Sequence, residues 1–248
     1  MDATFPRERR SDLGWLGVRV YPVTLGIALV AVAECIALAV GVSPIIMLDW
    51  DRGHYMDAAR RFLDTGTPYL ASEVLAPFDY QPLTFLHPPN ALYLMVPFAF
   101  LPDAAWYLVP LAIIAISLYA WQPARWAWPI LALCLAWPRS QSMIVTGNTD
   151  LWVAAFVALG CRYGWPALLI GIKPSLAPVA LVGVRHRSWW LALPVGIAAC
   201  VPFGSLWFDW FAVVRNAPGD LLYSVLALPL ILMPFIAWRV RTKPDQML

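Results

Sequence analysis

Two acids, Asp49 and Asp51, stand where a long apolar run ends and a polar segment with helical periodicity begins. Asp is a favoured N-cap, so either carboxylate could accept hydrogen bonds from the first backbone N–H groups of a helix. A carboxylate held at that point could also act as a general base and take a proton from a substrate hydroxyl. Both roles stay open, because a capping Asp can also face a substrate.

Lys173 is unusual for its surroundings, because it interrupts the apolar segment 165–184 and is followed by Pro174. A Lys near the centre of a membrane span costs about 2.5–3.5 kcal/mol on insertion scales, so a functional role is the default hypothesis. It could bind an anionic substrate group. It could instead snorkel, or donate to a carbonyl that the proline break leaves unpaired. Glu34 is similarly costly in the first apolar run, and a structural role is expected. It could pair with Lys173 or Arg139, or stay protonated beside a Ser or Trp.

Three further polar residues are candidates for substrate binding. His87 precedes a double proline beside an apolar segment, where it could bind substrate or serve the structure. Asn148 stands in a Gly-Asn-Thr-Asp turn and could hold a sugar or cap the following helix. Arg215 is another possible cation, although a solvated loop is the simpler explanation of its charge.

The elements that position these residues must lie in a membrane. Hydrophobic residues make up 61% of the chain and charged residues only 13%, whereas a soluble domain carries roughly 25% charged residues. Basic residues are scattered or flank apolar runs, which indicates membrane topology and excludes a nucleic-acid surface. The cysteines fall inside apolar segments without metal-ligand spacing, so neither a metal site nor a disulfide is predicted. No cofactor is implied.

The apolar segments predict an all-α polytopic protein with about eight spans. Residues 1–20 form a basic arm and residues 239–248 a basic tail, both expected in the cytoplasm, on either side of one transmembrane domain, 21–238. The acidic loop 49–89 is expected outside. The segment 165–184 is either one broken span or two half-helices. The predicted spans are 22–47, 90–101, 104–121, 126–137, 150–163, 165–184, 189–203 and 221–238.

The outer loop should contain a short amphipathic helix over residues 51–64 that lies on the membrane surface. Tyr55, Ala59 and Phe62 share one apolar face at helical spacing. The other face is polar and consists of Arg52, Asp57, Arg60, Arg61 and Asp64. Within it, Asp57 and Arg61 are spaced for an ion pair. Gly66 and Pro68 then predict its end. The prolines after His87 forbid a regular helix, so a rigid, partly extended segment should lead into the next apolar stretch.

Several motifs in this order resemble those of the family 87 glycosyltransferases, a branch of the GT-C membrane glycosyltransferases. The resemblance covers roughly residues 20–190. Members typically have more spans after the Lys-Pro motif, so the chain resembles a short member. The matching motifs are Asp51 four residues before Tyr55, Ala58-Ala59-Arg60, Gly66-Thr67-Pro68-Tyr69, Tyr80-Gln81-Pro82, Gly147-Asn148-Thr149-Asp150 and Gly171-Ile172-Lys173-Pro174.

This resemblance implies an inverting enzyme that takes a sugar, often mannose, from a polyprenyl-phosphate carrier. The acceptor would be a glycolipid or glycan on the outer face of a membrane, and an outer-face reaction suits a bacterial cytoplasmic membrane. It implies Asp51 as the base, with Asp49 as a second acid or a cap. Lys173 is the first candidate to contact the phosphate, with His87 and Arg215 as alternatives. Tyr55, Tyr80 and Asn148 would help to bind substrate.

Two other functions remain open at this stage. A transporter or flippase would suit the broken segment around Lys173 and Pro174, because transporters often bind substrate at discontinuous helices near the midplane. An accessory subunit of a glycan pathway, or a relative that binds lipid without transferring sugar, would tolerate changes at Asp51. A transferase would lose its activity with Asp51→Asn, whereas a transporter should depend more on Lys173 and Glu34.

Overall fold

The computed structural model describes residues 14–39, 48–79, 84–217 and 226–242. All regular elements in these residues are α or 3-10 helices, and the β pairing among them is an isolated bridge. The predicted all-α class is therefore confirmed for the described part of the chain. In order, the helices are α1 (Gly14–Ala39), α2 (Trp50–Thr65), α3 (Ala71–Leu75), η1 (Pro89–Ala91), α4 (Leu92–Phe98), α5 (Asp103–Trp121), η2 (Arg125–Ala127), α6 (Trp128–Ala136), α7 (Pro138–Thr146), α8 (Asp150–Tyr163), η3 (Trp165–Ile172), η4 (Pro174–Gly183), α9 (Arg187–Cys200), η5 (Val201–Phe203), α10 (Leu206–Asn216) and α11 (Leu228–Arg239).

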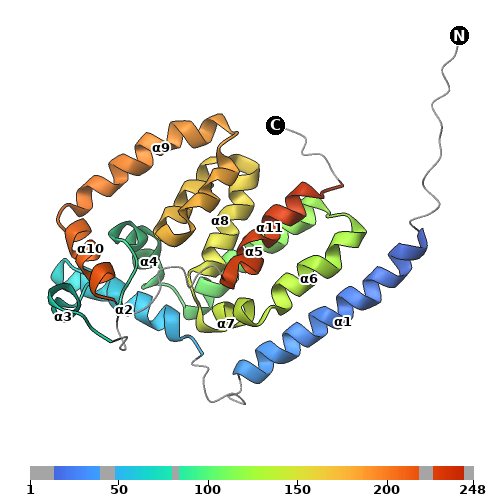
Figure 1. Cartoon of the computed structure of the whole chain (residues 1–248), viewed down its shortest axis with the longest axis horizontal. Helices are drawn as coiled ribbons and strands as arrows, with labels where there is room; N and C mark the ends of the chain where they lie inside the picture. Colours follow the sequence, from blue (N-terminus) through green and yellow to red (C-terminus); the bar gives the residue numbers. More distant parts are fainter. Residues whose placement is uncertain (1–13, 40–47, 80–83, 218–225, 243–248) are drawn as a thin grey trace, which may run out of the picture.

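Helix α8 forms the centre of the fold. Nearly all of its side chains are buried, and it packs against α5, α11, η3 and η4. Figure 1 shows it between the pair formed by α5 and α11 and the elements that lead into α9. A helix that is apolar on every side has to be enclosed by other elements, which explains why α8 lies innermost.

Helix α1 lies at the edge of the fold, along α6 and α7 (Figure 1). It begins at Gly14, inside the predicted arm, and the described part of the predicted first span ends at Ala39. Its Leu25, Leu29 and Ile36 side chains are each more than half exposed. An exposed apolar face of this kind marks contact with a membrane or with another protein.

The described residues support between one and three membrane spans, so the predicted eight are not confirmed. Among the described residues, α5 is long and apolar enough to cross a membrane by itself. Two bent pairs, α7 with α8 and α9–η5 with α10, raise the total to three if each pair counts as one span. Helix α1 has 26 residues, but of it only Val23–Glu34 counts as an apolar stretch, and the other predicted spans are shorter helices or broken segments. Eight spans therefore remain a prediction.

The segment around Lys173 is broken into two 3-10 helices, η3 and η4. Lys173 connects them with φ −132° and ψ 87°, outside the helical region. Pro174 explains the break, because its ring disfavours a helical conformation at the residue before it. The predicted break at Lys173 is therefore confirmed, and the choice between one broken span and two half-helices stays a prediction.

Helix α2 confirms the predicted amphipathic helix with nearly the predicted bounds. Tyr55, Met56 and Ala59 are buried on its inner face. Gly66 follows in the left-handed region, φ 80°, and its N–H donates to the carbonyl of Phe62 at 2.8 Å. The predicted end of the helix is thus correct, because glycine adopts a positive φ without a steric cost.

The predicted charge pattern of this helix is wrong in two places. Arg61 does not pair with Asp57; it donates to the carbonyl of Pro68, and Asp57 lies 3.4 Å from Arg60 instead. Arg52, assigned to the polar face, is only 8% exposed. Periodicity places a residue on a face of a helix but does not show which loop or helix packs on that face.

The chain after His87 follows the predicted course. Pro88 is extended, with φ −67° and ψ 158°, and η1 begins at Pro89 before α4 continues. Proline is suited to the first position of a helix because its missing N–H would have no partner there. Tyr80, a predicted substrate-binding residue in this loop, lies outside the described residues.

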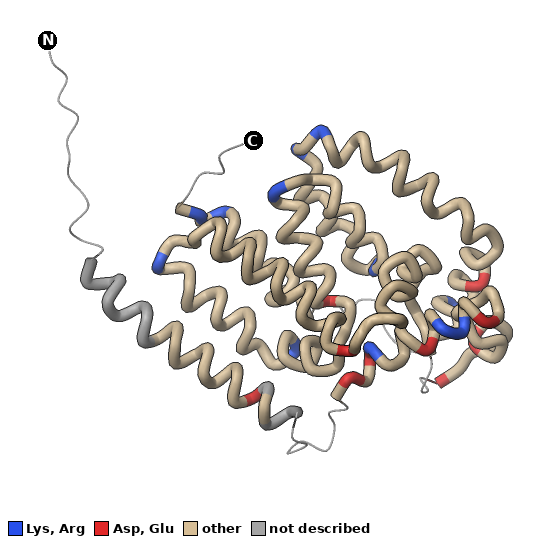
Figure 2. The backbone as a smooth tube through the Cα atoms, turned by 180° about the vertical axis from the view of Figure 1, so that it is seen from behind, with Lys and Arg blue, Asp and Glu red and all other residues tan. Residues whose placement is uncertain are grey.

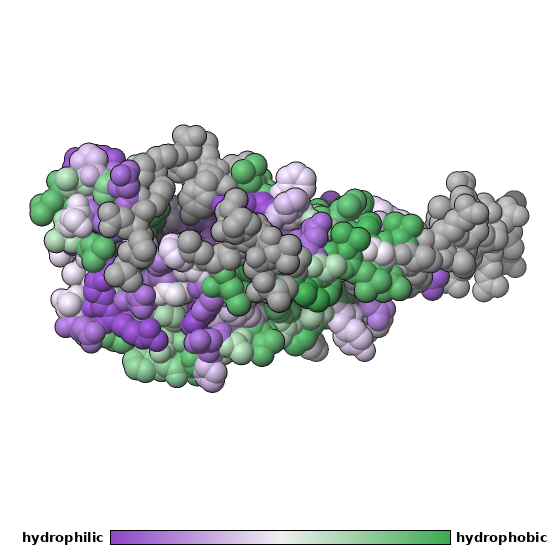
Figure 3. All heavy atoms as spheres, turned by 90° about the horizontal axis from the view of Figure 1, so that it is seen from below, coloured by the Kyte–Doolittle hydropathy of each residue, from purple (hydrophilic) through white to green (hydrophobic). Residues whose placement is uncertain are grey.

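Acidic residues gather at one end of the bundle, together with the arginines of α2, and the opposite end carries basic residues (Figure 2). Figure 2 shows Asp and Glu toward the end that carries α2 and α3, and an opposite end that carries Lys and Arg. Seen from the α2 end in Figure 3, hydrophilic residues gather over α2 and α3, and hydrophobic surface continues toward α1. This polarity agrees with a basic cytoplasmic end and an acidic outer end.

Candidate functional site

The site forms where the start of α2 meets the turn between α7 and α8. The axes of α7 and α8 differ by 103°, and residues 147–149 form the tight turn between them. The N–H of Asp49 donates to the carbonyl of Val145 at 3.1 Å and joins the two segments. Asp49 itself has φ 64°, a conformation that Asp tolerates better than most residues. The chain can therefore reverse here and direct α2 away from the turn.

Asp51 receives two hydrogen bonds from this turn. The Thr146 hydroxyl donates to Oδ2 of Asp51 at 2.5 Å, and the Asn148 side-chain amide donates to the same oxygen at 2.9 Å. No other hydrogen bond to Asp51 comes from the described residues, so Oδ1 remains available for a ligand. The side chain is partly exposed. Asp51 is thus an oriented carboxylate with one oxygen fixed.

Gly147 gives the turn its shape. Its φ is 73°, and a Cβ at this position would lie 2.6 Å from the Tyr107 hydroxyl and 2.8 Å from Cβ of Arg52. The Trp106 indole donates to the carbonyl of Gly147 at 2.7 Å. Only glycine meets both the conformational and the steric demand, so Gly147 sets the positions of Thr146 and Asn148.

Asn148 joins Asp51 to the break between η3 and η4. Its Oδ1 accepts from Nζ of Lys173 at 3.1 Å and from the N–H of Asp150 at 3.1 Å. The second bond pairs the N–H of the first residue of α8, but the N-cap position is Thr149 and no N-cap side chain bonds to this helix, so the predicted capping by Asn148 is not borne out. An amide has separate donor and acceptor ends, so this side chain can connect a carboxylate on one side with an ammonium group on the other.

Lys173 forms a buried ion pair with Asp150. Its Nζ lies 2.6 Å from Oδ1 of Asp150, and the two side chains are 4% and 0% exposed. Of the alternatives for Glu34, the pairing with Lys173 is therefore wrong, and Glu34 is exposed on α1. The sequence alone could not show this, because the pairing depends on the η3–η4 break meeting the first turn of α8.

His87 lies behind the same turn. Its Nδ1 is 3.0 Å from the carbonyl of Ile172, and its Nε2 is 3.5 Å from the Thr149 hydroxyl. The Tyr55 ring contacts it edge-on with centroids 5.0 Å apart. Burial, helped by the charge of Lys173, lowers the pKa of His87 to about 4. The ring is thus neutral at pH 7, and Nδ1 carries the proton because the carbonyl can only accept.

Asp49 belongs to a second network, beside the first. Its Oδ1 is 2.5 Å from Nε of Arg52 and accepts from the Tyr107 hydroxyl at 2.7 Å. Arg52 also reaches Asp103 at 2.9 Å. The Asp49 side chain makes no capping hydrogen bond to α2. The predicted cap is therefore wrong for this side chain, whose carboxylate holds Arg52 instead.

The structure brings together most of the predicted residues. Asp51, Asn148 and Lys173 form one hydrogen-bonded chain. His87 lies against the adjoining Thr149, and Tyr55 packs on the His87 ring. Arg215 is not part of this chain of hydrogen bonds, because its side chain is exposed in the last turn of α10. The next residue, Asn216, donates to the carbonyl of Glu73 in α3. The sequence analysis missed the roles of Thr146, Arg52, Asp103 and Tyr107, for which no motif gives a signal.

The combined networks can accept protons and bind hydroxyl groups. Asp51 is partly exposed and its Oδ1 accepts no hydrogen bond from the described residues, whereas Lys173 and Asp150 neutralise one another in the interior. The described residues contain no group of three His, Cys, Asp or Glu side chains placed to hold a metal ion. Together the two networks contain four carboxylates and two cations, namely Asp49, Asp51, Asp103, Asp150, Arg52 and Lys173.

Comparison of the chain with known protein families, characterised proteins and solved structures finds no match. The function has to be inferred from the residues of the site and from their resemblance in type and spacing to those of the family 87 glycosyltransferases.

Proposed function

We propose that the chain is a membrane glycosyltransferase. It transfers a sugar, mannose by the family resemblance, from a polyprenyl-phosphate carrier to a glycolipid or glycan on the outer face of a bacterial cytoplasmic membrane. One observation carries the proposal. Asp51, Asn148 and Lys173 come from three separate motifs that resemble those of family 87, and they meet in a single hydrogen-bonded chain.

In the proposed reaction, an acceptor hydroxyl attacks the anomeric carbon of the carrier-bound sugar. The bond from that carbon to the phosphate oxygen breaks, the phosphate leaves with the electron pair, and the configuration inverts. Oδ1 of Asp51 accepts the hydroxyl proton. Thr146 and Asn148 support this role because their bonds to Oδ2 fix the carboxylate, and a positioned base of this kind contributes about 10²–10⁴-fold to a rate.

The leaving phosphate needs a positive charge nearby. Lys173 is the cation joined to Asp51, through Asn148, but its charge is shared with Asp150. In this proposal Lys173 acts mainly by holding Asn148 and by reducing the negative potential around Asp51. Its direct contact with phosphate, suggested by the sequence, would require the bond to Asp150 to open.

The carrier also needs an apolar surface for its polyprenyl chain. A groove of about 640 Å³ runs between the end of α2, helix α4 and the turn from η5 to α10. Phe62, Leu92 and Phe203 are among the side chains that line it. The groove lies at the end of the bundle to which α2 belongs, which supports a carrier that approaches from the membrane beside the amphipathic helix.

A transporter is the second candidate, and the buried pair favours it. Ionisable side chains within membrane segments often mark the path of an ion. Oδ2 of Asp150 is buried and has no hydrogen-bond partner among the described residues. A proton or cation could use this acceptor, and the break at Lys173 would then resemble the discontinuous helices of transporters. Such a protein should depend on Asp150 and Lys173 more than on Asp51.

The decisive experiment compares membranes that contain the wild type, Asp51→Asn or Asp57→Asn at equal amounts. The measurement is the transfer of labelled mannose from polyprenyl-phosphate-mannose to lipid-extractable product. We expect Asp51→Asn to lower transfer by about 10²–10⁴-fold. Asp57→Asn, which removes a carboxylate from the exposed side of the same helix, should transfer normally. A wild type that is inactive with several lipid-phosphate sugars and acceptors would overturn the proposal.

A further inference from the structure

A second groove lies near the ends of η4 and α11, away from the Asp51 site. It has a volume of about 700 Å³ and is open to the surroundings. Val179 and Val182 line it from η4, and Leu232 and Phe235 line it from α11. The surface along most of its length is therefore apolar and suits hydrocarbon rather than a polar solute.

One end of this groove carries two arginines. Arg185 directly follows the cap of η4, and Arg239 is the last residue of α11. Both side chains are exposed, and neither has a hydrogen bond or ion pair with another described residue. The lining residues of each helix precede its arginine, so both charges lie beyond the apolar part.

The rim beside Arg239 is held in place by stacking. The guanidinium of Arg241 lies 4.6 Å from the centre of the Trp238 ring and donates to the carbonyl of Trp238 at 2.8 Å. Trp238 lines the groove. Trp is typical of the membrane interface. Along α11, Trp238 stands between the apolar lining residues of the groove and Arg239.

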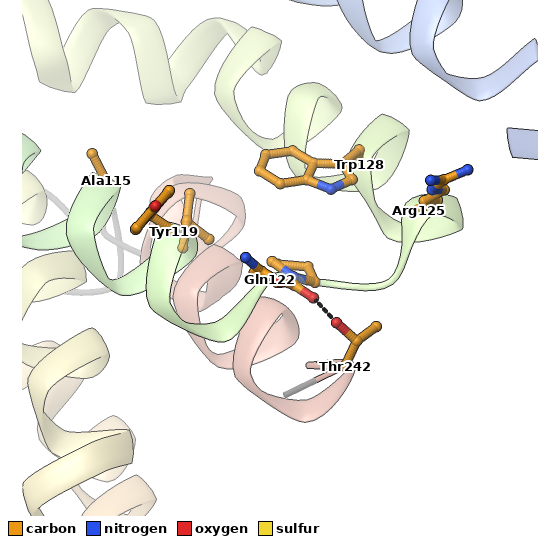
Figure 4. A pocket seen from close by; sticks show the side chains of 8 residues that line it. Ala115, Tyr119, Gln122, Arg125, Trp128 and Thr242 are labelled. Carbon is orange, nitrogen blue, oxygen red and sulfur yellow. Dashed lines mark hydrogen bonds between the residues drawn. The ribbon is translucent and has the colours of Figure 1, made fainter. Parts of the chain in front are cut away.

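Another pocket at the end of α5 lacks this arrangement and serves as a comparison. Figure 4 shows Trp128, Tyr119 and Gln122 around it, with Arg125 at the rim opposite Tyr119. Its one arginine already has an interaction within the protein. The groove between η4 and α11 thus differs from this pocket in having two arginines without a partner among the described residues.

We propose that this groove binds an anionic phospholipid, with the phosphate between Arg185 and Arg239 and the acyl chains along Val182, Leu232 and Phe235. Basic pockets between membrane helices on the cytoplasmic side bind anionic headgroups, and this end of the bundle carries the basic residues (Figure 2). The inference requires that the chain resides in a membrane, as the proposed function does, but it is independent of the transfer reaction.

The test uses the full chain in a mild detergent and measures lipid retention by native mass spectrometry. Dioleoyl-phosphatidylglycerol is the anionic probe and dioleoyl-phosphatidylcholine the zwitterionic one. We expect Arg185→Gln and Arg239→Gln each to weaken phosphatidylglycerol binding about fivefold, since one basic residue near an anionic lipid surface contributes on that scale. Arg187→Gln is the matched control: it removes an exposed arginine two positions from Arg185 that does not line the groove.

Three results would overturn the inference. The first is equal retention of the two lipids by the wild type. The second is an equal effect of Arg187→Gln and Arg185→Gln, which would indicate a diffuse charge effect. The third is displacement of the lipid by free glycerol phosphate at similar concentration, which would show that the apolar groove plays no part. Failure of sugar transfer leaves all three measurements unaffected, so the two proposals can fail separately.

Discussion

Asn148 donates its side-chain amide to the carboxylate of Asp51, with Nδ2 and Oδ2 2.9 Å apart, although 97 positions separate the two residues. The contact joins the first turn of α2 to the turn before α8. Through the other end of the same amide it continues to Lys173. The carboxylate proposed as the base is therefore oriented by the buried centre of the fold, and the following predictions test that link.

Asp51→Asn should abolish sugar transfer without changing the fold. Asn has the same shape, and its side-chain oxygen can still accept from Thr146 and Asn148. We expect activity to fall by about 10²–10⁴-fold and the thermal unfolding midpoint in detergent to stay near that of the wild type. A large drop in this midpoint would instead indicate a structural role for Asp51.

Loss of either member of the Lys173–Asp150 pair should destabilise the fold strongly. Lys173→Met leaves the Asp150 carboxylate buried without its partner, which costs about 3–5 kcal/mol. The double variant Lys173→Met with Asp150→Asn should recover much of this loss, because no charge is left unpaired. The free energy of unfolding in detergent is measured for Lys173→Met, for Asp150→Asn and for the double variant.

Arg215→Met is the control for that experiment. It removes an exposed charge outside the network, and such surface changes usually alter the free energy of unfolding by less than about 0.5 kcal/mol. If the losses of the two single variants simply added in the double variant, Lys173 and Asp150 would not stabilise one another.

The stability of the fold should fall at acidic pH through His87. Its pKa drops from 6.5 to about 4 in the folded chain. Above pH 6.5 the ring is neutral in both states, and its full contribution to stability is present. As the pH falls toward 4, His87 becomes protonated in the unfolded chain while it is still largely neutral in the folded chain. The free energy of unfolding should therefore decrease by about 3 kcal/mol.

His87→Asn isolates this effect, because Asn cannot titrate and its amide can still donate to the carbonyl of Ile172. Unfolding is measured at pH 7.5 and at pH 4.5 for both proteins. We expect the wild type to lose more stability between these values than the variant. An equal loss would assign the acid sensitivity to other groups.

Gly147→Ala should destabilise the turn that carries Asn148. Its Cβ would approach the Tyr107 hydroxyl to 2.6 Å, and φ is 73°, so a cost of at least about 1–2 kcal/mol is expected. Gly53→Ala is the matched change within α2, where a Cβ meets nothing within 4 Å. There Ala should stabilise the helix by about 0.5–1 kcal/mol. The same sign for both changes would contradict the steric argument.

The orientation of the bundle can be tested by labelling single cysteines. Leu75→Cys lies in the predicted outer loop on an 82% exposed side chain, and Arg187→Cys lies at the basic end. In intact cells, a membrane-impermeant maleimide should label position 75, and position 187 only after the membrane is opened. The reverse pattern would invert the proposed topology. Serine replaces the native cysteines in both variants: Cys35, Cys134, Cys161 and Cys200.

The sequence by itself determined the helical class, the extent of α2 and the break at Lys173. Each follows from local effects: apolar residues at helical spacing, a glycine that accepts positive φ, and a proline that restricts the residue before it. These effects act within a few positions of the chain, so they can be read without knowing what packs nearby.

Only the tertiary structure decided which charged residues meet. Arg52 was assigned to a polar face, yet it is buried between Asp49 and Asp103. Lys173 pairs with Asp150 rather than Glu34, and Thr146 gains its role because α7 and α8 meet at 103°. These pairings depend on how helix ends far apart in the sequence approach in space. A charged side chain that becomes buried on folding needs an oppositely charged or hydrogen-bonding partner beside it. The residues near it in the sequence do not show which distant residue will be that partner.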